Sequence, residues 1–146
     1  MKNENIDNLI KTGFLKIKQF EKAEIRAMFD SIQTNMGVVK NMPLDEDSAT
    51  IIFREAYESI RQLGEAKWWI EGFELQGLGT HTISLDILKE MEIKEKVKLN
   101  YLDRFRKIRH DINYRAFMVS VSQAKEILEF WDSCGKEILE ILRKSI

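Results

Sequence analysis

Residues 48–75 read S-A-T-I-I-F-R-E-A-Y-E-S-I-R-Q-L-G-E-A-K-W-W-I-E-G-F-E-L. Apolar side chains recur in this stretch at steps of three or four residues, the spacing that places side chains on one face of a helix. They are Ile52, Ala56, Ile60, Leu63 and Ala66. The acidic residues 45–47 precede the stretch and suit the positive end of a helix dipole. The pattern predicts one long amphipathic helix.

The rest of the chain also favours helices, because proline occurs only once, at Pro43, and glycine only seven times. Further helices are expected over residues 6–17, 21–40, 80–91, 94–114 and from residue 120 to about 142. Ser120 followed by Gln123 predicts a capping box, and Thr80 or Thr82 can cap the helix that begins near them. No segment is expected to be a strand. Because short connections favour antiparallel neighbours, we predict an all-α, up-and-down antiparallel helical bundle of five to six helices, forming a single domain over residues 1–146.

Composition limits the classes of function. The chain has 23 Lys and Arg against 24 Asp and Glu, a formal net charge of −1. It does not resemble a protein that coats nucleic acid through bulk charge, so any RNA contact must depend on a local patch. The only cysteine, Cys134, excludes an internal disulfide, suits a reducing compartment and is expected to be a small core residue.

Several kinds of site and segment are not expected. No apolar run approaches the length of a membrane span, and residues 1–8 are too polar for a signal peptide; we expect a cytoplasmic protein without membrane contact. The chain lacks a phosphate loop of the G-x-x-x-x-G-K-[ST] type, an H-E-x-x-H motif and a Cys-x-x-Cys pair. We therefore expect neither a bound metal nor a cofactor.

The chemistry-bearing residues gather in residues 104–115, R-F-R-K-I-R-H-D-I-N-Y-R, which hold four arginines and one of the two histidines. The expected core-facing stripe of this helix is Val97, Tyr101, Phe105, Ile108 and Ile112. An arc of about 100° nearly opposite this stripe holds Arg106, Arg109, His110 and Asn113, whereas Arg104 lies apart. Arginine suits phosphate and histidine exchanges a proton near neutral pH, so this face has the groups that phosphodiester binding and cleavage require. The alternative is an ordinary solvated face.

The other histidine, His81, lies beside an expected helix start in the turn G-L-G-T-H-T of residues 77–82. Capping or packing is the expected role for this side chain, rather than catalysis.

The order of several segments resembles the HEPN family (higher eukaryotes and prokaryotes nucleotide-binding domain), and the likeness covers most of the chain. The segments are I-D-N-L-I at 6–10, A-Y-E-S-I-R-Q-L-G-E-A at 56–66, G-L-G-T-H-T at 77–82, I-R-H-D-I-N-Y-R-A-F-M-V-S at 108–120 and A-K-E-I-L-E-F at 124–130. The resemblance implies a helical bundle that pairs with a second copy. For many members it also implies metal-independent ribonuclease activity or the toxin role in a two-gene module.

The family's signature is an arginine followed, four to six residues later, by a histidine, both facing a cleft at the dimer interface. With Arg109 as the arginine, the histidine position holds Tyr114, and His110 occupies a slot that is usually small and polar. Pairing Arg104 with His110 satisfies the spacing but shifts the register of the downstream segment. A phenol, with an ordinary pKa near 10, is a poor general base at neutral pH. Tyr114 in place of the family's histidine therefore argues against catalysis by the usual pair of residues.

Two functions therefore stay open. In the first, the chain is a toxin-type endoribonuclease with Arg109, His110 and Tyr114 in catalytic positions, and the remaining candidates contact RNA: Arg104, Arg106, Asn113 and Arg115. In the second, it is a non-catalytic HEPN module that binds RNA, a nucleotide or a nucleotidyltransferase-type antitoxin. Either reading is expected to involve a homodimer.

Overall fold

The long helix predicted from residues 48–75 is the central element of the fold. The computed structural model describes residues 3–146, so the first two residues of the polar opening lie outside the described part. Helix α3 (Ala49–Ile70) buries every residue of its predicted apolar stripe. In the turn before it, the Asp45 carboxylate accepts hydrogen bonds of 2.9 Å from the backbone N–H groups of Asp47 and Ser48. This turn satisfies donors that the start of α3 would otherwise leave unpaired.

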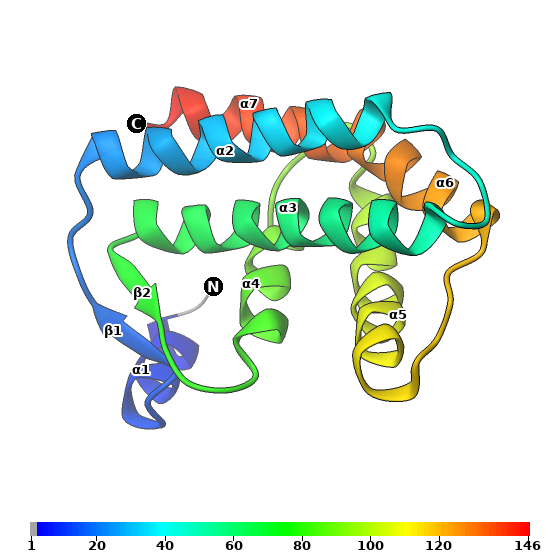
Figure 1. Ribbon diagram of the computed structural model, residues 1–146. Helices are drawn as coiled ribbons and strands as arrows, with labels where there is room; N and C mark the ends of the chain where they lie inside the picture. Colours follow the sequence, from blue (N-terminus) through cyan, green and yellow to red (C-terminus); the bar gives the residue numbers. More distant parts are fainter. Residues whose placement is uncertain (1–2) are drawn as a thin grey trace.

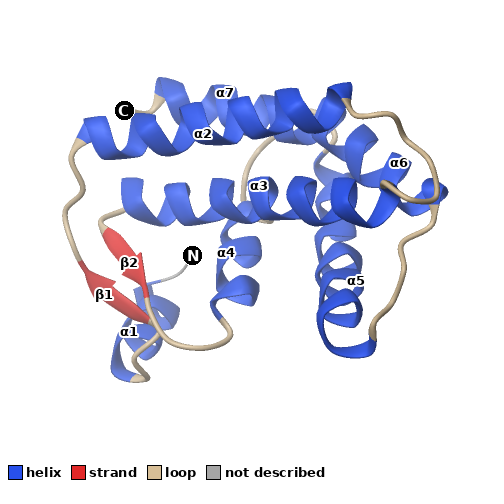
Figure 2. Ribbon diagram, viewed as in Figure 1, coloured by secondary structure: helices blue, strands red, loops and turns tan. Residues whose placement is uncertain are grey.

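Helices make up most of the described chain (Figure 2). Besides α3 they are α1 (Asn3–Lys11), α2 (Lys22–Asn41), α4 (Thr80–Leu88), the 3-10 turn η1 (Lys96–Asn100), α5 (Tyr101–Arg115), α6 (Val121–Phe130), the π turn η2 (Trp131–Gly135) and α7 (Lys136–Lys144). The predicted all-α helical bundle is confirmed. The helix expected from residue 120 onward comprises α6, η2 and α7, and its capping box is present, with Ser120 Oγ accepting from the Gln123 N–H at 3.1 Å.

The helices divide into two groups around α3. Figure 1 shows α2 running antiparallel to α3, with α7 beside α2, whereas α4 and α5 extend from the opposite side of α3 and cross its direction. Both α4 and α5 contact α3 and each other. Within residues 3–146, none of the helices combines the length and apolar character that crossing a bilayer requires.

A small two-stranded sheet replaces the ends of two predicted helices. Strand β1 (Leu15–Ile17) pairs antiparallel with β2 (Phe73–Leu75), and Leu15 lies opposite Leu75. The prediction of helix through residue 17 and through residue 75 was wrong at these ends, because Gly13 and Gly72 adopt φ angles of 81° and 92° that break the helices. Three-residue strands are too short to show an alternating pattern in the sequence.

The helix that carries the candidate residues, α5, begins seven residues later than predicted, at Tyr101 rather than residue 94. Its buried stripe is Leu102, Phe105, Ile108 and Ile112. The predicted stripe was wrong at its first two members, since Val97 is 80% exposed and Tyr101 is 41% exposed. The 3-10 turn η1 advances three residues per turn rather than 3.6, so the helical periodicity does not extend backward through it.

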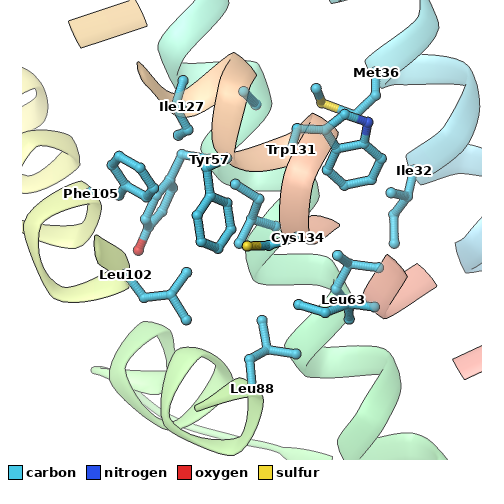
Figure 3. Packing of buried hydrophobic residues seen from close by; sticks show 14 of the residues in the cluster. Ile32, Met36, Tyr57, Leu63, Leu88, Leu102, Phe105, Ile127, Trp131 and Cys134 are labelled. Atoms are coloured by element: carbon cyan, nitrogen blue, oxygen red, sulfur yellow. The ribbon is translucent and has the colours of Figure 1, made fainter. Parts of the chain in front are cut away.

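The main core surrounds α3, which packs against α2 on one side and against α5 and the α6–α7 segment on others. Figure 3 shows Tyr57 from α3 packed near Leu102 and Phe105 from α5, with Trp131 and Cys134 from η2 further along. Cys134 is fully buried, which confirms the prediction of a core position. This packing fixes α5 against α3 and leaves the opposite face of α5 free.

Candidate functional site

A pocket of about 250 Å³ lies between the start of α4 and the second half of α5, and we call it the α4–α5 pocket. It is lined by Gly79, His81, Thr82, Arg106, Arg109, His110, Asn113 and Tyr114. All four residues that helical spacing placed on one arc of α5 are among them. No Asp or Glu lines it, so its formal charge is positive and an anion is the ligand class that it suits.

Arg109 is the most constrained cation of the α4–α5 pocket. Its Nε and Nη1 atoms are buried and have no hydrogen-bond partner among the described residues. A buried charged donor without a partner costs free energy, so an acceptor that reached these two nitrogens would lower the free energy of the site. Arg106, one helical turn earlier, lines the same pocket from an exposed position. The two guanidinium groups can hold the oxygens of one phosphate in the bidentate manner typical of arginine.

His110 and Tyr114 stand one turn apart on α5. Their ring centroids are 4.8 Å apart, and Tyr114 is 75% exposed. Both rings line the α4–α5 pocket, so the histidine of the sequence and the phenol at the family's histidine position face the same space. Asn113 adds an amide that can donate to or accept from a ligand.

The opposite wall of the pocket comes from α4. The helix begins after Gly79, whose φ of 80° lies in the left-handed region, and no side chain caps it. Thr80 is the first helical residue rather than the predicted cap. Two of the contacts between α4 and α3 are specific to particular residues: the indole Nε1 of Trp68 donates to the backbone oxygen of Ile83 at 3.1 Å, and Gly64 lets the backbone of Ser84 approach closely.

His81 reaches the pocket from the first turn of α4. Its Nδ1 lies 3.2 Å from the hydroxyl of Tyr57 on α3, and the two rings stack at 5.8 Å between centroids. Burial raises the pKa of Tyr57 to about 12. Burial also lowers the pKa of His81, and the charge of Arg61 adds to this effect. At neutral pH the phenol is therefore protonated and the imidazole neutral.

Two of the candidates from the sequence lie outside the pocket. Arg104 forms an ion pair with Glu126 on α6 and stacks over the Tyr101 ring at 5.2 Å. Arg115 is exposed at the end of α5, with its Nε 3.8 Å from the Asp111 carboxylate. The structure brings together the other five: Arg106, Arg109, His110, Asn113 and Tyr114.

A larger pocket of about 670 Å³ lies between α2 and α7. The cations at its rim are already engaged in ion pairs, because Lys40 and Lys136 share Asp132 and Arg143 pairs with Asp30. No histidine lines it. The smaller α4–α5 pocket is the better candidate, since it combines unpaired cations with groups that transfer protons.

Sequence reasoning missed the contribution of α3 and α4. His81 was expected to cap or pack; it does pack on Tyr57, but it also lines the pocket, 29 positions before His110. The G-x-G of residues 77–79 was the signal in the sequence that could have indicated this wall of the pocket, because it marks the turn from which α4 starts, beside α5. Within residues 3–146, no three His, Cys, Asp or Glu side chains lie together as metal ligands would.

We compared the chain with known protein families, proteins and solved structures and found no relative. No family model, no curated protein and no solved structure matches the chain. The family resemblance therefore stays a prediction from the sequence, and the geometry of the α4–α5 pocket is what indicates a function.

Proposed function

We propose that this protein is a HEPN-like, toxin-type RNA-targeting protein of the cytoplasm that binds an RNA phosphate in the α4–α5 pocket and cleaves beside it. The observation that carries the proposal is Arg109, whose buried Nε and Nη1 lack partners within the described chain. A phosphate oxygen is the acceptor that such a guanidinium group binds best. Arg106 shares the phosphate, and the exposed Arg115 attracts the flanking strand from outside the pocket. Arg104 can contact that strand only by exchanging its ion pair with Glu126 for a phosphate.

The cleavage that fits these groups uses the RNA itself as nucleophile. The 2′-oxygen attacks the adjacent phosphorus, a 2′-O–P bond forms and the P–O5′ bond breaks. His110 takes the proton from the 2′-hydroxyl and returns it to the leaving 5′-oxygen, which gives a 2′,3′-cyclic phosphate and a 5′-hydroxyl end. Arg109 and Arg106 stabilise the charge that grows on the phosphate oxygens, while Asn113 and Tyr114 orient the strand. This step uses no metal or cofactor.

A second function is favoured by Tyr114, which occupies the position where the family signature has histidine. In this alternative the α4–α5 pocket binds RNA or a nucleotide without cleaving it, or binds a nucleotidyltransferase-type antitoxin. The high exposure of Tyr114 suits a contact surface as well as a substrate-orienting role.

A homodimer belongs to both versions of the proposal. Two exposed apolar side chains flank the elements that form the α4–α5 pocket: Leu78, in the loop before α4, is 93% exposed, and Met118, in the loop after α5, is 70% exposed. Each could contribute apolar area to a contact between two copies of the chain. A two-fold axis at this surface would bring two copies of the basic pocket together.

The test is incubation of purified protein with total RNA in excess chelator. Wild-type protein should cleave, and His110→Ala should lose about 10²- to 10⁴-fold in rate while still binding RNA. Tyr114→Phe should act more mildly, since orientation of the strand depends only partly on the hydroxyl. Arg26→Ala, which removes an exposed arginine of α2 far along the chain from the pocket residues, is the matched control for charge.

Two outcomes would count against parts of the proposal. Cleavage by His110→Ala at the wild-type rate would remove the role of that histidine. RNA binding by the wild type with no cleavage in any RNA tested would select the non-catalytic module. The neighbouring gene is an inexpensive second observation, because a nucleotidyltransferase gene beside this one supports the antitoxin partner.

A further inference from the structure

The pocket holds a second histidine whose surroundings differ from those of His110. His81 stands on α4 with its Nδ1 3.2 Å from the Tyr57 hydroxyl. Tyr57 is 1% exposed and its ring belongs to the main core, near Leu102 and Phe105 (Figure 3). A core phenol cannot swing toward another partner without disturbing that packing. The Tyr57–His81 contact is therefore fixed from the Tyr57 side.

The direction of this hydrogen bond follows from which atoms can accept the O–H of Tyr57. The Tyr57 hydroxyl is nearly inaccessible to water, so its O–H needs an acceptor inside the protein. Nδ1 of His81 is the hydrogen-bond partner found for it among the described residues. A neutral imidazole has one donor nitrogen and one acceptor nitrogen. If Nδ1 accepts from Tyr57, the ring proton is on Nε2.

We infer that Tyr57 is a positioning residue that holds His81 as a neutral imidazole, with its Nε2–H donating to a phosphate oxygen bound in the α4–α5 pocket. His81 lines this pocket, and with Nδ1 occupied by Tyr57 the Nε2 edge is the one left for a ligand. The inference rests on the proposed function only in taking the ligand to be a phosphate. It assigns His81 a binding role that differs from proton exchange by His110.

The charges around His81 favour the same state. Arg61 and Glu58 face it from α3, and Arg106 and Arg109 face it from α5. Burial and the three arginines lower the pKa of His81, while Glu58 opposes them. Three cations against one anion disfavour a further positive charge on the imidazole. The pocket thus gains a hydrogen-bond donor without gaining a titrating charge in the neutral range.

In this state the charged and polar groups of the pocket have different roles. Arg106 and Arg109 supply charge, His81 supplies a donor of fixed direction, and His110 remains the histidine that can exchange a proton. A donor held by the core loses little freedom when ligand binds, which is the benefit of a preorganised site. Protonation of His81 at Nδ1 would remove the acceptor for the Tyr57 O–H. The contact could then persist only in the reverse direction, with the buried phenol proton left without an acceptor.

The first measurement is the tautomer of His81, read from two-bond nitrogen–proton correlations in the ¹⁵N NMR spectrum of the whole protein at neutral pH. Wild type should show the proton on Nε2, and inorganic phosphate should shift these signals. Tyr57→Phe keeps the ring but removes the donor, so His81 should become a mixture of tautomers. The affinity of the Tyr57→Phe protein for inorganic phosphate should fall about two- to tenfold, the usual effect of losing one hydrogen bond. Tyr101→Phe, on the exposed start of α5, is the matched control and should change neither property.

Variants of His81 test the donor itself and do not depend on the folding of Tyr57→Phe. His81→Gln places an amide N–H near the Nε2 position and should retain most of the phosphate affinity. His81→Asn places its amide near Nδ1 and should lose affinity to the level of His81→Ala. Equal affinity in the glutamine and asparagine variants would overturn the inference.

A proton on Nδ1 in the wild type would also overturn it, as would a Tyr57→Phe variant with the wild-type tautomer and phosphate affinity. Failure of the proposed RNA cleavage has a separate signature, because the tautomer and the phosphate titration are measured without RNA. Loss of cleavage activity with the predicted tautomer intact would reject the ribonuclease and leave the Tyr57–His81 pair as part of a phosphate-binding module.

Discussion

Replacing Gly64 by alanine should move one wall of the α4–α5 pocket. A Cβ added at Gly64 would lie 1.9 Å from the backbone oxygen of Ser84 on α4, whereas ordinary van der Waals contact begins at 3.4 Å. The difference requires a displacement of about 1.5 Å between α3 and α4 at this point, by packing geometry. Because the obstructing atom belongs to the backbone, no side-chain rotation can relieve the clash. His81 lies on the same helix, three positions before Ser84, and must move with it.

Two effects of Gly64→Ala follow from this displacement. Overpacking of this kind costs about 1–3 kcal/mol of unfolding free energy, and for a chain of this size each kcal/mol lowers Tm by about 3 °C. A shift of about 1 Å in a positioned group can cost about 10²-fold in rate, so cleavage should fall by more than the loss of stability explains. Urea denaturation measures the loss of unfolding free energy, and a titration with inorganic phosphate, followed at the NMR signals of His81, measures the effect on the pocket.

The matched control is Gly37→Ala, about one turn before the end of α2, where an added Cβ meets no atom within 4 Å. Alanine is about 1 kcal/mol better than glycine inside a helix, so this variant should be at least as stable as the wild type. Equal stability and unchanged His81 signals in both variants would refute the conclusion that the Gly64–Ser84 contact sets the position of α4.

Four further outcomes are expected. Replacing Arg106 and Arg109 together with alanine should reduce the salt slope of RNA binding by about 0.7 for each phosphate that is no longer neutralised; an unchanged slope in a filter-binding titration would identify a merely solvated face. The lowered pKa of His81 means that the unfolded chain binds a proton at this imidazole more tightly than the folded chain does, so the free energy of unfolding should fall as pH drops below about 6.5. Melting curves from pH 7.5 to 5.5, roughly the range in which histidine titrates, should show this fall for the wild type. His81→Gln should lose the part of the pH dependence that His81 causes. Ala116→Gly, at a φ of 51°, should raise the urea midpoint, because the left-handed conformation costs alanine about 1–2 kcal/mol and the greater unfolded freedom of glycine returns only about 0.5–1. Light scattering at tens of micromolar protein (about the affinity range of such contacts) should report a dimer, and a monomer would contradict the proposed pairing.

The sequence alone was sufficient for the helical class and for the composition of one functional face. Residues on a single helix keep a fixed angular relation of about 100° per position, so the spacing of Arg106, Arg109, His110 and Asn113 is enough to place them together. The same local rules located the capping box at Ser120, and the apolar character usual for a free cysteine indicated that Cys134 is buried.

Only the tertiary structure decided which elements meet. Nothing in the periodicity of α4 or α3 indicates that His81 and Tyr57 contact each other, or that both lie behind the arginines of α5, because a helical repeat defines a buried face but not the partner that covers it. The pairing of β1 with β2 joins residues almost sixty positions apart, and each strand is too short to have a pattern of its own. The face of α5 is a local property of its sequence, whereas the pocket requires the close approach of α4 to α3 that Gly64 permits.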